Sequence, residues 1–115
     1  MKKTCKIVIV ESIDEYDREI DRKIREDAIH EPLTGMVMTP ETFSKVFSPE
    51  RIKLLQRIYR NDIKNIYQLA KELDKPYEVV FRNIKYLEGI GLVKIKEKHK
   101  KMIPSLRCKP SIELV

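Results

Sequence analysis

Three side chains with the chemistry to bind other molecules, Tyr77, Arg82 and Lys85, lie three to five residues apart in one stretch of the chain. At the 3.6-residue period of an α-helix, this spacing places them on neighbouring parts of one helix surface. A guanidinium donates two parallel hydrogen bonds to a phosphate or to a guanine edge, and an ammonium group attracts anions. These residue types therefore indicate the binding of an anionic, hydrogen-bonding surface rather than bond-making chemistry.

A helix over about residues 76–88 has to position these side chains. Its apolar positions follow the i, i+4, i+7 pattern of a helix face that packs on a core; they are Val80, Ile84 and Leu87. Gly89 and Gly91 are expected to end the helix, because glycine readily adopts the left-handed backbone conformation of helix C-termini.

The outward positions of this helix include two further candidates whose roles stay open. Phe81 either contacts a base or packs against a neighbouring element. Glu78 is unfavourable beside a phosphate, so it either accepts a hydrogen bond from a cytosine amino group or lowers the affinity. Arg82 itself has a second interpretation, because an ion pair with Glu78 four residues earlier would need no ligand.

The charge distribution points to the same half of the chain. The 115 residues carry a net charge of +6, which divides into −2 over residues 1–48 and +8 over residues 49–115. Such segregation predicts that the second part meets a polyanion, with nucleic acid as the first candidate. An acidic protein or an anionic membrane surface stays open.

Patterns before and after the predicted helix suggest how the rest of the chain folds. Helix-start signals occur at Ser12, Thr39, Ser48 and Asn65, each with a capping side chain ahead of apolar residues at helical spacing. Residues 31–38 read as a loop. After Gly91 the apolar period changes from 3.6 to 2, which predicts a basic two-stranded ribbon over about residues 92–104. The residue pattern at 111–115 predicts a final strand, which we expect to pair with the β-branched run at residues 7–10.

From residue 49 this order predicts a helix, a short helix, a tight turn and a longer helix, followed by the basic ribbon. A short helix, a turn and a second helix form the helix-turn-helix layout, in which the second helix enters the DNA major groove. Further phosphate contacts are expected from the turns beside that helix; their residues are Lys75, Lys98, His99, Lys100 and Lys101.

The segments 66–73 and 80–93 resemble winged helix-turn-helix transcriptional regulators of the MarR and ArsR superfamily, over about residues 39–103. The run Leu87-Glu88-Gly89-Ile90-Gly91-Leu92-Val93 is similar to that family's passage from recognition helix into wing. The resemblance implies a winged helix-turn-helix fold and DNA binding. It implies nothing about the target sequence or the effector.

We therefore expect an α+β, mostly helical protein. Residues 1–38 form a strand and helix extension, and residues 39–115 form the DNA-binding domain. The expected function is that of a sequence-specific, double-stranded DNA-binding transcriptional regulator, active as a homodimer. The alternative is a winged-helix protein-interaction module, such as an antitoxin or a subunit of a transcription complex, with residues 1–38 contacting the partner. RNA binding is a weaker third interpretation.

Other function classes have little support in the sequence. It contains no phosphate-binding, dinucleotide-binding, zinc-protease or serine-hydrolase motif, so we expect no catalytic residues and no cofactor. Its cysteines, Cys5 and Cys108, show no metal-ligand spacing and are expected to be reduced thiols. No apolar run has the roughly 18 residues of a membrane span, and the stretch 7–10 is too short for a signal peptide, which together predict a cytoplasmic protein.

Overall fold

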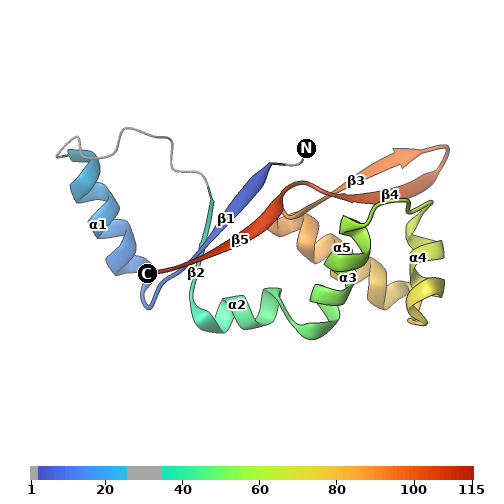
Figure 1. The fold of residues 1–115 in the computed structure, drawn as a ribbon, viewed down its shortest axis with the longest axis horizontal. Coiled ribbons are helices and arrows are strands. Elements are labelled where there is room, and N and C mark those ends of the chain that lie inside the picture. Colours follow the sequence, from blue (N-terminus) through green and yellow to red (C-terminus); the bar gives the residue numbers. More distant parts are fainter. Residues whose placement is uncertain (1–2, 26–34) are drawn as a thin grey trace. The chain divides into compact units, whose positions relative to one another are not determined.

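The computed structural model describes residues 3–25 and 35–115, which form two compact units with mixed α+β structure. The first, here the helical unit, comprises Lys3 and Val46–Lys109. The second, here the sheet unit, comprises Thr4–Lys45 and Pro110–Val115 (Figure 1). The α+β class agrees with the prediction. The division differs from the expected boundary after residue 38, because residues 39–45 and 110–115 belong to the sheet unit.

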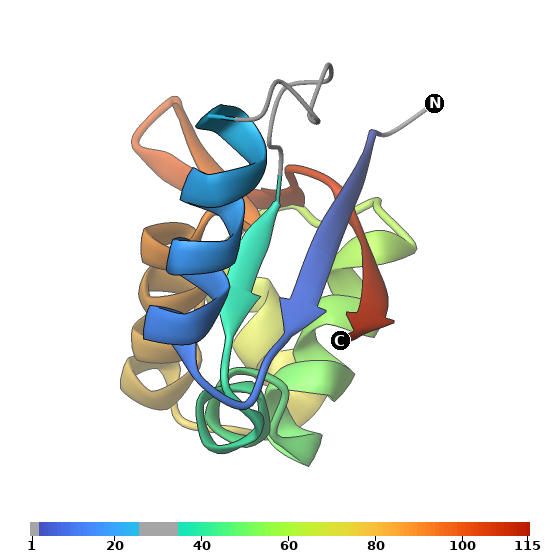
Figure 2. The same ribbon diagram turned by 90° about the vertical axis from the view of Figure 1, so that its left-hand side faces the viewer.

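The sheet unit contains three strands in the order β2-β1-β5, seen side by side in Figure 2. They are β1 (Thr4–Ile9), β2 (Met36–Met38) and β5 (Lys109–Leu114). β2 runs parallel to β1, with Ile7 opposite Met36 and Ile9 opposite Met38. The loop predicted for residues 31–38 is therefore wrong at Met36–Met38, because parallel pairing with β1 makes these residues a strand; residues 31–34 lie outside the described part. The predicted pairing of the last strand with the first is confirmed.

Two helices flank these strands in the chain. α1 (Ile13–Arg25) lies in the connection between the parallel strands β1 and β2, to one side of the sheet (Figure 2). Its start was predicted correctly, since the Ser12 hydroxyl accepts a hydrogen bond from the Glu15 amide at 3.3 Å. Its expected continuation to residue 29 lies outside the described residues. α2 (Pro40–Val46) begins after Thr39, whose hydroxyl accepts from the Thr42 amide at 3.3 Å.

The helical unit contains three helices, α3 (Pro49–Tyr59), α4 (Ile66–Leu73) and α5 (Tyr77–Ile90). Both predicted N-caps are confirmed: the Ser48 side chain accepts from the Arg51 amide, and Asn65 Oδ1 accepts from the Gln68 amide at 2.7 Å. α5 extends two residues beyond the predicted end. Only Gly91 supplies the left-handed cap, at φ 103°, so the role predicted for Gly89 is wrong.

An antiparallel hairpin, β3 (Val93–Lys98) and β4 (Lys101–Leu106), completes this unit. Its turn is at His99 and Lys100, both with positive φ of 52° and 63°. Two central residues in the left-handed region define the tight turn whose twist matches that of the flanking strands. The predicted ribbon and its turn are thus confirmed as local structure.

The core of the helical unit forms where the three helices meet the inner face of the hairpin. Its buried residues come from every element of the unit; they are Leu54, Leu55, Ile58, Ile66, Leu69, Ala70, Val80, Ile84, Leu87, Leu92, Val93 and Leu106. Two large apolar residues of α3 lie outside this core, since Ile52 is 40% exposed and Tyr59 is 50% exposed. The expectation of reduced cysteines is also wrong, since Cys5 and Cys108 are both disulfide-bonded.

Candidate nucleic-acid interface

The connection between α4 and α5 is short and held by backbone hydrogen bonds. α4 ends at Asp74 in the left-handed conformation, φ 53°, and the Asp74 amide bonds to the carbonyls of Ala70 and Lys71. The Lys75 amide then bonds to the Ala70 carbonyl at 3.1 Å. Pro76 has an extended backbone and precedes the first turn of α5. These contacts fix the direction in which α5 leaves α4.

α5 buries one face and exposes the other. Val80, Ile84 and Leu87 are at most 2% exposed, so this face is packed into the core of the unit. Because residues lie 100° apart around a helix, the intervening positions point away from that core. The predicted contact residues of α5 lie there: Tyr77, Glu78, Arg82 and Lys85 are exposed, and Phe81 is half-buried.

Lys85 and Arg82 differ in whether their charge is paired with an acidic side chain of this chain. Lys85 Nζ lies 2.9 Å from Glu88 Oε1, in an ion pair that is open to solvent. Exposed pairs of this kind contribute about 0–1 kcal/mol, so a phosphate can compete with Glu88 for the lysine. Arg82 has no ion pair with Glu78 or any other acid in the part of the chain that the structure describes. Its guanidinium therefore keeps all its donors available.

Three aromatic rings gather near the start of α5: exposed Tyr67 on α4, and exposed Tyr77 and half-buried Phe81 on α5, here the aromatic cluster. Tyr77 stacks on Phe81 with ring centroids 5.8 Å apart, and Tyr67 on α4 lies 6.5 Å from Tyr77. Lys71 Nζ covers the Tyr67 ring at 4.7 Å from its centroid. Tyr67 and Lys71 were not among the predicted contacts, although Tyr67 falls on the outward side of the predicted short helix. Because these contacts engage the ring faces, the hydroxyl groups and ring edges are the parts best placed to meet a ligand.

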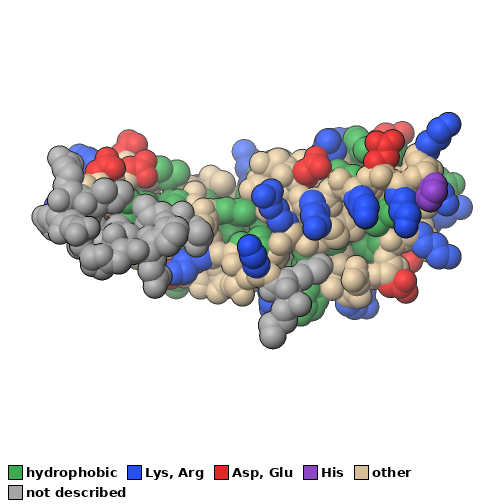
Figure 3. Space-filling view, turned by 90° about the horizontal axis from the view of Figure 1, so that it is seen from above, with side chains coloured by type: hydrophobic (Ala, Val, Ile, Leu, Met, Phe, Trp, Pro, Cys, Tyr) green, Lys and Arg blue, Asp and Glu red, His purple; other side chains and the backbone are tan. Residues whose placement is uncertain are grey.

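The hairpin carries its lysines on one face. Alternate residues of a strand point to opposite sides, and directly opposed residues of an antiparallel pair point to the same side. Lys94, Lys96 and Lys98 therefore share a face with Lys101, which lies opposite Lys98. All four are exposed, and we call them the outer-face lysines. Figure 3 shows a row of Lys and Arg side chains over this part of the molecule.

The remaining predicted contacts lie at turns. His99 and Lys100 form the exposed tip of the hairpin, next to Lys98 and Lys101, and Lys75 is exposed between α4 and α5. The predicted contact residues thus all belong to the helical unit and form two groups, one around α5 and one at the hairpin turn.

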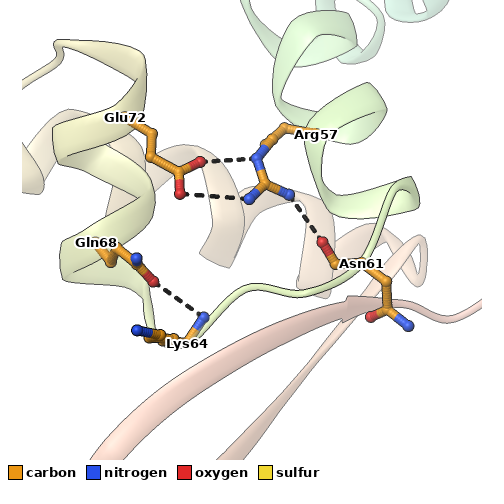
Figure 4. A network of polar contacts seen from close by, with 5 residues as sticks. All are labelled: Arg57, Asn61, Lys64, Gln68 and Glu72. Carbon is orange, nitrogen blue, oxygen red and sulfur yellow. Dashed lines mark hydrogen bonds and ion pairs between the residues drawn. The ribbon is translucent and has the colours of Figure 1, made fainter.

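Two arginines on α3, neither of them among the predicted contacts, hold the other two helices of the unit in place. Arg57 donates to both carboxylate oxygens of Glu72 on α4, at 2.7 and 3.3 Å, and to the Asn61 carbonyl at 2.8 Å (Figure 4). Arg51 donates to Asn83 Oδ1 on α5 at 3.1 Å, and its guanidinium lies 4.0 Å from the centroid of the Tyr86 ring.

The bidentate pair of Arg57 and Glu72 changes the titration of both groups. The hydrogen bond from Arg57 lowers the pKa of the Glu72 carboxyl below its ordinary value, against the opposing effect of burial, and the positive charge of Arg57 adds to the lowering. The same hydrogen bond raises the pKa of Arg57. Both groups therefore stay charged over a wide pH range, which keeps α4 attached to α3.

Residues 3–25 and 35–115 contain no group of three or more His, Cys, Asp or Glu side chains that could hold a metal ion. Within the same residues, no helix has the length and apolar character needed to cross a membrane.

A comparison with known protein families identifies the family of this chain. A family model described as HVO_A0114 matches residues 46–109, which are more than half of the chain and coincide with the main segment of the helical unit. No curated protein and no solved structure matches the chain. The matched segment contains every predicted contact residue on α5 and on the hairpin.

Proposed function

This chain belongs to the HVO_A0114 family, and we propose that it is a sequence-selective, double-stranded DNA-binding transcriptional regulator with a winged helix-turn-helix domain. The observation that carries the proposal is the exposed side of α5, where Arg82 has no acidic partner among the described residues and where Tyr77 and Lys85 are also exposed.

The order of elements supports this proposal. The short helix α4, a fixed three-residue connection and the longer helix α5 match the helix-turn-helix layout, with α5 as the recognition helix. A major groove about 12 Å wide admits one helix of this kind. The basic turn of the β3–β4 hairpin takes the role of a wing that reaches neighbouring phosphates.

The proposed roles follow from the side-chain chemistry. Arg82 donates two hydrogen bonds to the O6 and N7 atoms of a guanine, and Lys85 contacts a phosphate one turn further on. Tyr77 directs its hydroxyl group to a phosphate or its ring edge to a thymine methyl group. Lys75 and the tip of the hairpin at His99 and Lys100 contact the backbone of this duplex, which positions the protein without selecting a sequence.

One recognition helix contacts too few bases for useful selectivity, so we propose a homodimer that binds two half-sites about one helical turn apart. Residues 1–38 supply the dimer contact in this proposal, and the DNA target places the protein in the cytoplasm. Light scattering coupled to gel filtration checks the dimer; a monomer both with and without DNA contradicts it.

The test of DNA binding is a gel shift with duplex fragments selected from a random pool, at two salt concentrations and with excess competitor DNA. Arg82→Ala is expected to lose about 1–3 kcal/mol of affinity, roughly 5- to 150-fold, and to relax the preference at one base pair. Lys85→Ala should weaken binding to all sequences about equally and reduce the salt slope by about one.

Lys53→Ala is the matched control, because Lys53 is exposed on α3 and is not part of either contact group. It should leave selectivity unchanged. If Tyr77→Ala, Arg82→Ala and Lys85→Ala all bind the selected duplex as the wild type does, α5 is not a recognition helix and the chain is better described as a protein-interaction module.

A further inference from the structure

The outer face of the β3–β4 hairpin carries positive charge well beyond its turn. The outer-face lysines Lys94, Lys96, Lys98 and Lys101 share this face with Ser105 and Ile103, which lie opposite Lys94 and Lys96. The single acid of the hairpin, Glu97, falls on the opposite face by the alternation of the strand. All the charged side chains of the outer face are therefore basic.

The charge of these lysines is not neutralised within the chain. None of the four forms an ion pair in the described residues, whereas Lys6, Arg57 and Lys85 elsewhere do. Four like charges on neighbouring positions of a two-stranded sheet repel one another, and opposed like charges lower sheet stability. A bound polyanion relieves this repulsion.

The outer-face lysines also point away from α5. The inner face of the hairpin packs on α3, α4 and α5, and its Val93, Pro104 and Leu106 are buried. The sheet thus separates the lysines from the helices, as the ribbon in Figure 1 and the row of basic side chains in Figure 3 together indicate. A duplex held by Arg82 on the far side of α5 leaves Lys94 and Lys96 free.

The spacing of the lysines fits a nucleic-acid backbone. At about 3.3 Å per residue, the row from Lys94 to Lys98 extends over roughly 13 Å. Neighbouring phosphates of one B-DNA strand are further apart than their rise of about 3.4 Å along the helix axis, because the strand winds around that axis, so the row meets about two or three phosphates. An extended, regular row of ammonium groups suits such a backbone better than it suits a small anion.

We propose that the outer face of the hairpin is a second DNA-binding surface, which takes the phosphate backbone of a second duplex while α5 holds the first, so that one protein bridges two DNA segments. The contact is independent of sequence because it is made to phosphates. This inference rests on the proposed function for the identity of its ligand, and it goes beyond that function by adding a site.

A bridging assay tests the proposal. One duplex containing the selected sequence is immobilised, the wild-type protein is bound, and capture of a second, labelled duplex of unrelated sequence is measured. The variant Lys94→Gln/Lys96→Gln is expected to bind the first duplex with unchanged selectivity and to lose about tenfold or more of the capture. Its capture should also depend less on salt, by a slope of about 0.9 for each phosphate contact removed.

The matched control is Lys53→Gln/Lys64→Gln, which removes two exposed charges from α3 and from the segment before α4. It should capture the second duplex as the wild type does. Capture that is equal for the Lys94→Gln/Lys96→Gln variant and the wild type overturns the proposal, as does binding of the first duplex without any capture. Preferential capture of single-stranded RNA over the labelled duplex also overturns it.

The outcomes separate this proposal from the proposed function. If the wild type binds DNA without sequence selectivity but captures a second duplex through the outer-face lysines, the regulator proposal fails and the second surface stands. If the wild type binds DNA selectively but captures no second duplex, the regulator proposal stands and the second surface is wrong. If no duplex is bound at all, both proposals are wrong.

Discussion

The ring of Tyr77 stacks on the ring of Phe81, with centroids 5.8 Å apart and planes inclined by 20°. The two residues are one helical turn apart on α5, so the stacking holds Tyr77 at the start of the proposed recognition helix. Phe81 is half-buried, which places it as a support for Tyr77.

Phe81→Ala is expected to lower the free energy of unfolding by about 1–2 kcal/mol, because it removes the stacked pair and half-buried apolar area. Urea denaturation measures the change. Phe81→Leu keeps most of the area and should lose less. An unchanged denaturation midpoint for the alanine variant would show that the ring contact contributes nothing to stability.

Glu72→Gln tests the pair of Arg57 and Glu72 through its pH dependence. The pKa of Glu72 is lowered in the fold, mainly by the hydrogen bond from Arg57. The carboxylate therefore stabilises the protein fully at pH values above 4.5, the ordinary pKa of a glutamate. This contribution is lost as the pH falls through the lower, folded-state pKa. Thermal unfolding should show the variant to be less stable at pH 7, with the difference closing in acid.

Arg57→Lys should reduce the same pH dependence, because lysine keeps the charge but cannot form the bidentate contact. A difference between Glu72→Gln and wild type that stays constant from neutral pH to strong acid would contradict the assignment.

Gly89→Ala is expected to stabilise the protein by about 0.5–1 kcal/mol. Gly89 lies inside α5, and a Cβ atom there meets no atom within 4 Å, so alanine removes unfolded-state freedom without a clash. Gly91→Ala is the contrasting variant, because its φ of 103° disfavours a side chain. It should lower the thermal unfolding temperature where Gly89→Ala raises it; loss of stability in both would show that position 89 also needs glycine.

Gly35→Ala is expected to destabilise the sheet unit by about 1–3 kcal/mol. Gly35 has a φ of 139°, and a Cβ atom there would lie 2.7 Å from the Lys6 carbonyl oxygen of β1. Because that oxygen belongs to the backbone, relief requires movement of the strand. Chemical denaturation measures the loss, and an alanine variant as stable as wild type would mean that Gly35 and Lys6 are further apart in solution.

Much of the helical unit could be predicted because its signals are local. The side-chain oxygens of Ser48 and Asn65 cap helices by accepting hydrogen bonds from backbone amides three residues later. The buried positions of α5 follow from the helical period of its apolar residues. The exposed positions of Tyr77, Arg82 and Lys85 follow from that same period. Tyr67 escaped prediction because its place beside Tyr77 depends on how α4 meets α5.

The sequence by itself determined where helices begin, which face of α5 is exposed, and that the hairpin turn lies within residues 98–101. Each of these depends on hydrogen bonds or periodicity over a few residues. Only the tertiary structure decided that Met36–Met38 is a strand, that Ile52 and Tyr59 are exposed, and that Arg57 engages Glu72. Their partners lie far away in the chain, and no local pattern specifies which distant residues come into contact.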